Sequence, residues 1–257
     1  MRRFLLFGLS LLVCLAACTK DKNPLDTGED DEKEPIPAIV YGDTAAAVSM
    51  PQHDIEWPSL ADSPWPMPFR TPQGVARSPL PGPQTGEIVQ RINLPGTDAV
   101  NYAQPIIGPD NTIYISPLGR GLFAYTFAGD SLWEITDDSI KTTFRLPHFS
   151  APVIDARGNL YGRAHNPWSS GKDSTIVFSA TADGDIRWRS RVKGRYCSIL
   201  SMGKDSLLFF ITTNGCLHAL SRATGREVWS VDGGTGFTHT TLGTLPLSPE
   251  GDVIYLS

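Results

Sequence analysis

A ten-residue block that recurs along the chain is the feature that most restricts its fold. The block occupies residues 105–114, 152–161, 200–209 and 246–255. Each copy has apolar residues near its start, then Gly, Asp, Asn or Lys, and ends with Tyr or Phe. Gly, Asn and Asp tolerate the backbone of tight turns, and apolar flanks suit strands that pack on a core. Each block therefore predicts two antiparallel strands joined by a tight turn.

A second repeated unit, Gly-x-x-x-Trp, alternates with this block at residues 129–133, 184–188 and 225–229. Residues 86–90 form a fourth copy, in which Gln90 stands in the tryptophan position. A repeat of about 40 residues that contains four short strands is typical of a β-propeller blade. One blade cannot bury both of its faces, so neighbouring blades must stack. The sequence therefore predicts an all-β protein, a β-propeller of four-stranded blades.

The tryptophans of the second unit are predicted to have a structural role. Trp133, Trp188 and Trp229 recur at one position of the repeat. A large ring at a fixed place in each blade fills the gap to the next blade, and truncating a buried ring of this kind costs about 3–5 kcal/mol. We expect these three residues to dock the blades together.

Residues 219–229 resemble the tryptophan-docking motif of quinoprotein-type, or PQQ-like, β-propeller repeats, with Ser221 in place of the motif's aspartate. Residues 63–87 are similar to the N-terminal segment of PQQ-repeat lipoproteins. The resemblance covers residues 63–257 and implies the propeller fold. The characterised analogue that it suggests is the scaffold lipoprotein of the β-barrel assembly machinery. Because one fold hosts many activities, the resemblance is specific for the fold and not for the function.

The blade count predicts an incomplete ring. Full blades are expected at residues 103–137, 150–193 and 196–232, a lone outer strand at 86–94, and two strands at 244–257. Propellers have 4–8 blades, and the resemblance implies seven or eight. We therefore expect about three full blades plus partial ones, as in a truncated or fragmentary product with open sheet edges that favour association.

The N-terminus predicts an exported lipoprotein. Arg2 and Arg3 precede an apolar run at residues 4–13, and small residues lead to Cys18, which is the pattern of a secretory signal. Leu-Ala-Ala-Cys also resembles the lipobox of bacterial lipoproteins, which implies cleavage before Cys18 and acylation of its thiol, for example with palmitate. Thr19, instead of aspartate, suggests the outer membrane. An ordinary signal peptide with a nearby cysteine is the alternative.

The charge is concentrated before the repeats. Residues 19–56 contain ten acidic residues and three lysines, whereas residues 57–257 contain equal numbers of acidic and basic residues. Such an acidic stretch cannot bury enough apolar surface to offset its ordering entropy. We therefore predict a signal peptide at 1–17, a lipidated cysteine with a disordered tether at 18–56, and a repeat body at 57–257. The proline-rich start of the body, 57–83, predicts extended or turn-rich packing.

No catalytic, cofactor-binding or metal site is predicted from the histidines and acids. The five histidines lack the spacing of metal-binding motifs. His218 lies in an apolar stretch and is predicted to be a core or edge residue of a strand. His148 and His165 are predicted in loops, where they could line one surface. The acidic pair at 137–138 is predicted to be a solvated loop rather than a metal ligand.

The cysteines argue against a quinoprotein enzyme and for free thiols. Quinoprotein dehydrogenases hold PQQ over a tryptophan beside Ca²⁺, often with adjacent cysteines, and this sequence has no Cys-Cys pair. Cys197 and Cys216 are expected to start the first and third strands of one blade, about 9–10 Å apart. This separation exceeds the ~7 Å that a disulfide allows between Cα atoms. A PQQ- and Ca²⁺-dependent or glycan-active periplasmic enzyme is kept as an alternative.

One predicted strand carries five alternating positive charges. These are Arg187, Arg189, Arg191, Lys193 and Arg195. Alternate residues of a strand share a face, so the five would form one ridge. The ridge is a candidate binding surface for an acidic protein, lipopolysaccharide phosphate or an anionic glycan. Its alternative is a charged outer strand that prevents edge pairing.

These features together predict a non-enzymatic lipoprotein in the outer membrane, on its periplasmic face or at the cell surface. Acylated Cys18 would bind membrane lipid, and the propeller surface would bind envelope proteins or polymers without a cofactor. A β-barrel assembly scaffold is the second alternative, beside the periplasmic enzyme. The balanced charge of the body gives no indication of nucleic-acid binding.

Overall fold

The computed structural model describes residues 55–78, 85–94, 104–117, 120–136, 148–165, 174–194, 198–233 and 245–255, without the side chains of His148 and His165. The chain divides into two compact units, Met1–Gln52 and His53–Ser257, and the described residues all lie in the second. Every regular element in this part of the chain is a β-strand. The predicted all-β class is therefore confirmed.

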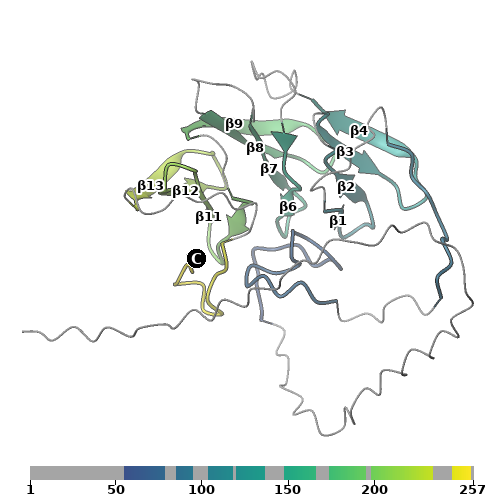
Figure 1. Ribbon diagram of the computed structural model, residues 1–257, viewed down its shortest axis with the longest axis horizontal. Helices are drawn as coiled ribbons and strands as arrows, with labels where there is room; N and C mark the ends of the chain where they lie inside the picture. The colour runs from purple at the N-terminus through teal and green to yellow at the C-terminus, as the bar shows by residue number, and fades with distance from the viewer. Residues whose placement is uncertain are drawn as a thin grey trace, which may run out of the picture. The chain divides into compact units, whose positions relative to one another are not determined.

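The described residues contain thirteen strands in three antiparallel sheets, which are shown in Figure 1. The first sheet contains β1 (Ile106–Ile107), β2 (Ile113–Ile115), β3 (Leu122–Tyr125) and β4 (Ser131–Ile135). The middle sheet contains β5 (His148–Phe149), β6 (Val153–Ile154), β7 (Leu160–His165), β8 (Ser174–Ala180) and β9 (Ile186–Lys193). The third sheet contains β10 (Ser201–Met202), β11 (Leu207–Ile211), β12 (Cys216–Ser221) and β13 (Glu227–Asp232).

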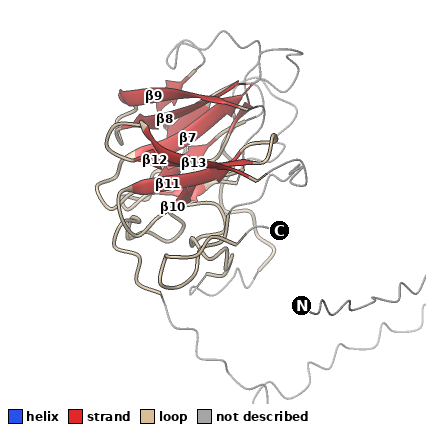
Figure 2. Ribbon diagram, turned by 90° about the vertical axis from the view of Figure 1, so that its left-hand side faces the viewer, coloured by secondary structure: helices blue, strands red, loops and turns tan. Residues whose placement is uncertain are grey.

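Each sheet follows chain order, as expected of a propeller blade. The orders are β1-β2-β3-β4, β5-β7-β8-β9 and β10-β11-β12-β13, and β6 also pairs with β7. Figure 2 shows the strands of the middle and third sheets running side by side. In the described part of the chain these three sheets do not close a ring. The structure is therefore a β-propeller-type arc of three blades, as the repeat predicted.

The middle blade has a divided first strand. β5 and β6 both pair with β7, and residues 150–152 separate them. Pro152 lies in this gap and has no N–H with which to continue the ladder. The inner edge of the blade is therefore bent, which a four-strand pattern did not predict.

The ten-residue blocks form the first two strands of each blade, as predicted. The second and last residues of each block pair at equivalent positions in the three blades: Ile106 with Tyr114, Val153 with Tyr161, and Ser201 with Phe209. The fourth copy forms one isolated bridge, between Leu247 and Ile254, rather than the two strands expected at 244–257.

The outer strand expected at residues 86–94 is also wrong. The structure describes residues 85–94 without strand pairing. No described segment beside them supplies the neighbouring strand that a ladder requires. The position of this segment in the repeat is nevertheless retained, as Gln90 shows below.

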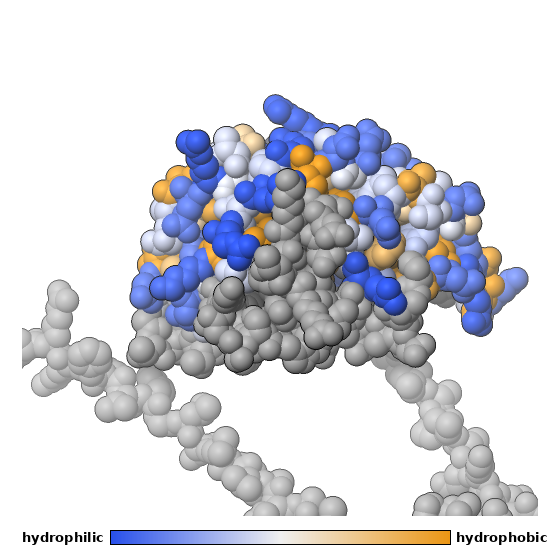
Figure 3. All heavy atoms as spheres, turned by 90° about the horizontal axis from the view of Figure 1, so that it is seen from above, coloured by the Kyte–Doolittle hydropathy of each residue, from blue (hydrophilic) through white to orange (hydrophobic). Residues whose placement is uncertain are grey.

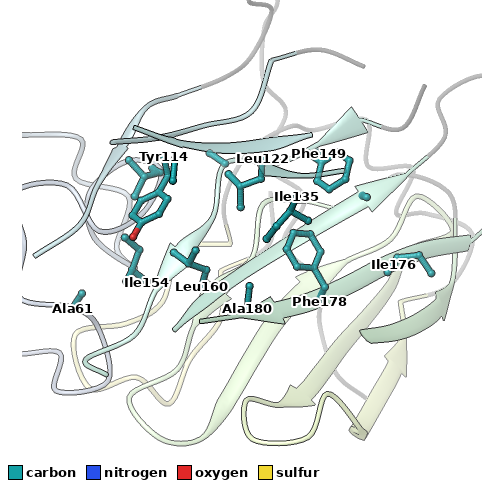
Figure 4. Packing of buried hydrophobic residues seen from close by; sticks show 14 residues of the cluster. Ala61, Tyr114, Leu122, Ile135, Phe149, Ile154, Leu160, Ile176, Phe178 and Ala180 are labelled. Carbon is teal, nitrogen blue, oxygen red and sulfur yellow. The ribbon is translucent and has the colours of Figure 1, made fainter. Parts of the chain in front are cut away.

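The buried residues of the described segments form three hydrophobic clusters. The first joins the first and middle blades, the second joins the middle and third blades, and the third joins the third blade to residues 245–254 and Trp57. Successive residues of β8 serve different clusters, because Ile176 and Phe178 belong to the first and Val177 to the second. Figure 4 shows the first cluster. Full burial of one Val, Leu, Ile or Phe side chain in these clusters stabilises the fold by about 1.5–3 kcal/mol.

Candidate functional site

The repeated tryptophans join each blade to the next. Trp133 Nε1 in β4 donates to the carbonyl of Ala182, 2.8 Å away in the β8–β9 turn of the middle blade. Trp188 Nε1 in β9 donates to the carbonyl of Arg222, 2.9 Å away in the β12–β13 turn of the third blade. Each outer strand thus binds the turn before the outer strand of the following blade, at a spacing that the repeat fixes.

The repeated glycine receives the preceding indole. A Cβ atom on Gly184 would lie 2.7 Å from Trp133 Cδ2, and one on Gly225 would lie 2.7 Å from Trp188 Cδ2. Both glycines have positive φ angles, +89° and +70°, which other residues adopt at a cost. Each Gly-x-x-x-Trp unit therefore takes part in two interfaces. Its glycine contacts the tryptophan of the previous blade, and its tryptophan contacts the next blade.

The copy without tryptophan occupies the same position. Gln90 Nε2 is the nearest atom to a Cβ built on Gly129, at 3.1 Å. Gln90 thus meets the first blade where an indole meets the later blades. This contact supports the assignment of residues 86–90 to the repeat, although they form no strand.

Each tryptophan also packs on an aromatic residue of its own blade. The ring pairs are Tyr114 with Trp133, Tyr161 with Trp188, and Phe209 with Trp229, at centroid distances of 5.7, 6.0 and 5.8 Å. Trp229 differs from the other two because it is 37% exposed, and its indole has no hydrogen-bond acceptor in the described part of the chain. The structure thus places Trp133 and Trp188 between blades and leaves Trp229 on the outer strand of the third.

A β-bulge precedes the tryptophan in every blade. In the middle blade Ser179 pairs with Trp188 and Ala180 with Ile186, so Arg187 has no partner in the ladder. The first and third blades skip Leu132 and Val228 in the same way. Such an extra residue changes the direction of a strand and of its side chain.

The bulge separates Arg187 from the predicted ridge. Arg187 Nη1 donates to the hydroxyl of Tyr161 at 3.3 Å and to that of Ser179 at 2.8 Å. These partners lie on the side of the middle blade that faces the third blade, as does Trp188. The predicted alternation of charged residues along β9 therefore fails at Arg187. Its guanidinium lies beside Tyr161 and Ser179 and not in the row of the other charges.

The next three charges of the ridge do alternate. Arg189, Arg191 and Lys193 are exposed on β9, and the first two lie opposite Phe178 and Ile176 of β8. Arg191 Nη1 also donates to Ser174 Oγ, 2.9 Å away. Arg195 lies outside the described residues. The face on the side of β4 and β9 is mostly hydrophilic, with hydrophobic residues in separate small patches (Figure 3).

His218 is a buried structural residue, as predicted. It is 5% exposed, and its ring stacks on Phe210 with a centroid distance of 5.1 Å. Its Nδ1 lies 2.7 Å from Glu227 Oε2 and its Nε2 lies 3.2 Å from Thr212 Oγ1. The hydrogen bond from His218 holds the pKa of the Glu227 carboxyl below its usual range, with a smaller contribution from Ser230.

This hydroxyl–imidazole–carboxylate order is that of a catalytic triad, but the hydroxyl is enclosed. Thr212 is fully buried, and a Cβ built on Gly194 would lie 2.5 Å from Thr212 Cβ. No substrate carbonyl can approach Thr212 Oγ1 through that packing. The network therefore ties β11, β12 and β13 together.

The loop placement of His148 and His165 is wrong. His148 lies in β5 and His165 in β7, and the two residues pair directly across the sheet. Phe149 and Ala164 form the next pair of the same ladder. His53, His239 and the acidic pair at 137–138 lie outside the described residues.

Cys216 is free, which agrees with the expected thiol, and it starts β12 as predicted. Burial raises the pKa of its thiol, with smaller contributions from Asp232 and Glu227. This shift disfavours the reactive thiolate. Cys197 lies outside the described residues, as does Cys18 with the whole predicted signal and most of the tether. No helix in the described ranges is long and apolar enough to cross a membrane.

The proline-rich segment binds the first strands of all three blades. Trp57 Nε1 donates to Met202 O of β10, the backbone N–H of Ala61 to Ile154 O of β6, and that of Ile107 in β1 to Trp65 O. Residues 57–66 thus occupy hydrogen-bonding positions on these strands, through their backbone at β1 and β6 and through the Trp57 side chain at β10. The prediction of extended or turn-rich packing is confirmed for residues 57–78, the described part of 57–83.

The described residues do not fit the PQQ site that the enzyme alternative would require. The first strands of propeller blades surround the central channel, and here residues 57–66 pack against them. The repeated indoles lie on the outermost strands and bond to the next blade, so they offer no stacking face to a central quinone. The described residues also contain no group of three His, Cys, Asp or Glu side chains positioned to hold a metal ion.

The three stacked blades, joined by tryptophan and glycine, define a protein of the β-propeller type. No protein-family model matches the chain, and no curated protein matches it.

Solved structures with similar blades have low sequence identity to the chain. A protein of unknown function from Bacteroides caccae is 13% identical, with 47% of this chain and 42% of that chain covered and a TM-score of 0.34. The quinohemoprotein alcohol dehydrogenase ADHIIG from Pseudomonas putida HK5 is 14% identical, with 55% and 27% covered and a TM-score of 0.40. BamB from Moraxella catarrhalis is 10% identical, with 57% and 66% covered and a TM-score of 0.22. The chain thus spans less than half of the first two structures.

Sequence reasoning missed the Thr212–His218–Glu227 network and the turn arginines described below. The Glu227 contact joins residues nine positions apart across a bulged strand pair, which no linear motif marks. The residues skipped at the bulges, Leu132, Arg187 and Val228, share no residue type, so the sequence carries no signal for the bulges.

Proposed function

We propose that the protein is a lipid-anchored component of the bacterial outer membrane whose blades bind an anionic envelope polymer without catalysing a reaction. The signal-like N-terminus and the lipobox resemblance at Cys18 support the anchor. The exposed row of Arg189, Arg191 and Lys193 on β9 is the observation that carries the binding role. The row lies on an outermost strand, where a long polymer can approach it without entering the fold.

The packing of the blades supports a binding role rather than catalysis. Residues 57–66 bond to the inner strands, and the indoles of Trp133 and Trp188 are engaged between blades. Both arrangements stiffen a scaffold that presents charged side chains on rigid strands, as a recognition surface requires.

Charge reversal tests the binding row. Purified protein carrying Arg189→Glu and Lys193→Glu should lose most of its binding to vesicles that contain lipopolysaccharide. Raising the salt concentration to about 1 M should likewise weaken binding of the unaltered protein to these vesicles, because the screening length falls from about 10 Å at 0.1 M to about 3 Å. Arg226→Glu, at an exposed arginine in the turn of the third blade, is the control for a charge reversal outside the row, and it is compared with Arg189→Glu alone as well as with the double variant. Equal losses in both variants would refute a role for the row.

A separate experiment tests the anchor and the partner. Cys18→Ser should abolish incorporation of labelled palmitate and release the protein from the membrane fraction. Crosslinking in cells, followed by mass spectrometry, identifies what the blades contact. Recovery of a barrel-assembly protein instead of polymer would favour the scaffold alternative and overturn the polymer-binding role.

A further inference from the structure

Three arginines from different parts of the chain line one cavity between the middle and third blades. The cavity has a volume of about 390 Å³. Arg157 lies in the β6–β7 turn, Arg187 in the bulge of β9, and Arg222 in the β12–β13 turn. Pro58 and Ser59 of the proline-rich segment complete one wall. The cavity is therefore built by rigid turns and strands.

The positive charge in this cavity is not neutralised by the residues around it. The one carboxylate in the lining is Asp155, which is 5% exposed. Its oxygens accept hydrogen bonds from the backbone N–H groups of Arg157 and Asn159, the Asn159 amide and the Tyr161 hydroxyl. None of these three arginines forms an ion pair within the described part of the chain. Three arginines thus line the cavity together with one carboxylate, whose oxygens already accept hydrogen bonds.

Two of the guanidinium groups are held in place. Arg187 is held by Tyr161 and Ser179, as described above. Arg222 Nη1 donates to Ser59 O at 3.2 Å, and the Arg222 carbonyl accepts the indole N–H of Trp188. Arg222 Nε is buried and has no hydrogen-bond partner in the described structure.

We propose that this cavity binds a phosphate or sulfate monoester carried on a small molecule or at a glycan end. Guanidinium groups present planar, paired donors that match the oxygens of such a group, and charge-assisted bonds of this kind are the strong ones. The volume lies within the range of small-molecule pockets and leaves room for the attached sugar. The site is distinct from the row on β9, because the bulge directs Arg187 to the opposite side of the blade from Arg189.

Calorimetric titration of the full chain with glucose 6-phosphate, inorganic phosphate and glucose tests the site. Glucose 6-phosphate should bind, phosphate should compete with it, and glucose should not bind. Arg157→Ser should lower the affinity for glucose 6-phosphate about tenfold, which is the loss expected for one charge-assisted hydrogen bond. The Arg157 side chain is exposed, and its backbone N–H bond to Asp155 remains in the variant, so folding is retained. Arg222→Lys, which keeps the charge but loses the paired donors, should also weaken binding.

Two controls separate this site from other surfaces. Arg226→Ser removes an exposed arginine outside the cavity and should leave the affinity unchanged. The Arg189→Glu, Lys193→Glu variant should bind glucose 6-phosphate normally even if it loses binding to lipopolysaccharide, so the two proposals fail independently. Equal affinity in Arg157→Ser and Arg226→Ser, equal binding of glucose, or no binding of either phosphate would overturn the assignment.

Discussion

Replacing Gly184 with alanine tests whether the contact between blades sets the stability of the arc. The added Cβ would lie 2.7 Å from Trp133 Cδ2, a separation that real Cβ atoms do not tolerate, and φ is +89°. Left-handed backbone costs about 1–2 kcal/mol in a non-glycine residue. Overpacking against a ring that cannot withdraw adds about 1–3 kcal/mol. The free energy of unfolding should therefore fall by about 2–5 kcal/mol.

Gly158→Ala is the matched control, because it shares the backbone strain without the clash. Gly158 lies in the same blade at φ +79°, and its nearest contact for a Cβ is 3.9 Å away. Urea unfolding followed by circular dichroism should show a loss of only about 1–2 kcal/mol for this variant. In a Trp133→Ala background, Gly184→Ala should cost no more than the control, a coupling energy of about 1–3 kcal/mol. If Gly184→Ala and Gly158→Ala lose the same stability, the indole does not fix the interface and the reasoning is refuted.

Three further substitutions give smaller tests, each read by urea unfolding. Trp188→Ala should lower the free energy of unfolding by about 1–2 kcal/mol more than Trp229→Ala does, because only the Trp188 substitution also removes a hydrogen bond to the next blade. Equal losses in the two variants would argue against docking. Asp155→Ala should cost about 2–4 kcal/mol by leaving buried donors unpaired, whereas Asp205→Ala, an exposed turn residue of the third blade, should cost less than about 1 kcal/mol. Since the pKa of Glu227 is lowered in the folded protein, its contribution is present above the pKa of an unfolded glutamate, about 4.3. That contribution is lost as pH falls through the folded pKa. At pH 7, Glu227→Gln should therefore be less stable than the parent protein by under about 1 kcal/mol, because the Glu227 side chain is half-exposed. In acid, where the carboxyl is protonated, the two proteins should have the same free energy of unfolding.

The blades themselves could be predicted because their signals are local. The paired ends of the ten-residue blocks, such as Val153 with Tyr161, follow from turn chemistry and alternation within a few residues. The structural role of His218 also followed from its apolar neighbours. The loop placement of His148 and His165 failed because the ladder of the middle blade extends further than its apolar pattern indicated.

The candidate sites depended on features that alternation cannot encode. A single bulged residue moved Arg187 from the predicted ridge to the opposite side of the blade. The cavity then required Arg157 and Arg222, which come from turns of two different blades. Contacts between residues so distant along the chain are set by how the blades stack, and no spacing in the sequence reports them.

The sequence by itself determined the repeat, the strand pairs and the tryptophan at the end of each blade, because these depend on turn residues and on a period that neighbouring residues share. Only the tertiary structure decided which glycine each indole meets, that the proline-rich segment lies on the inner strands, and which charges share a cavity. Those outcomes depend on bulges and on the packing of whole blades, where a shift of one residue exchanges the two faces of a strand.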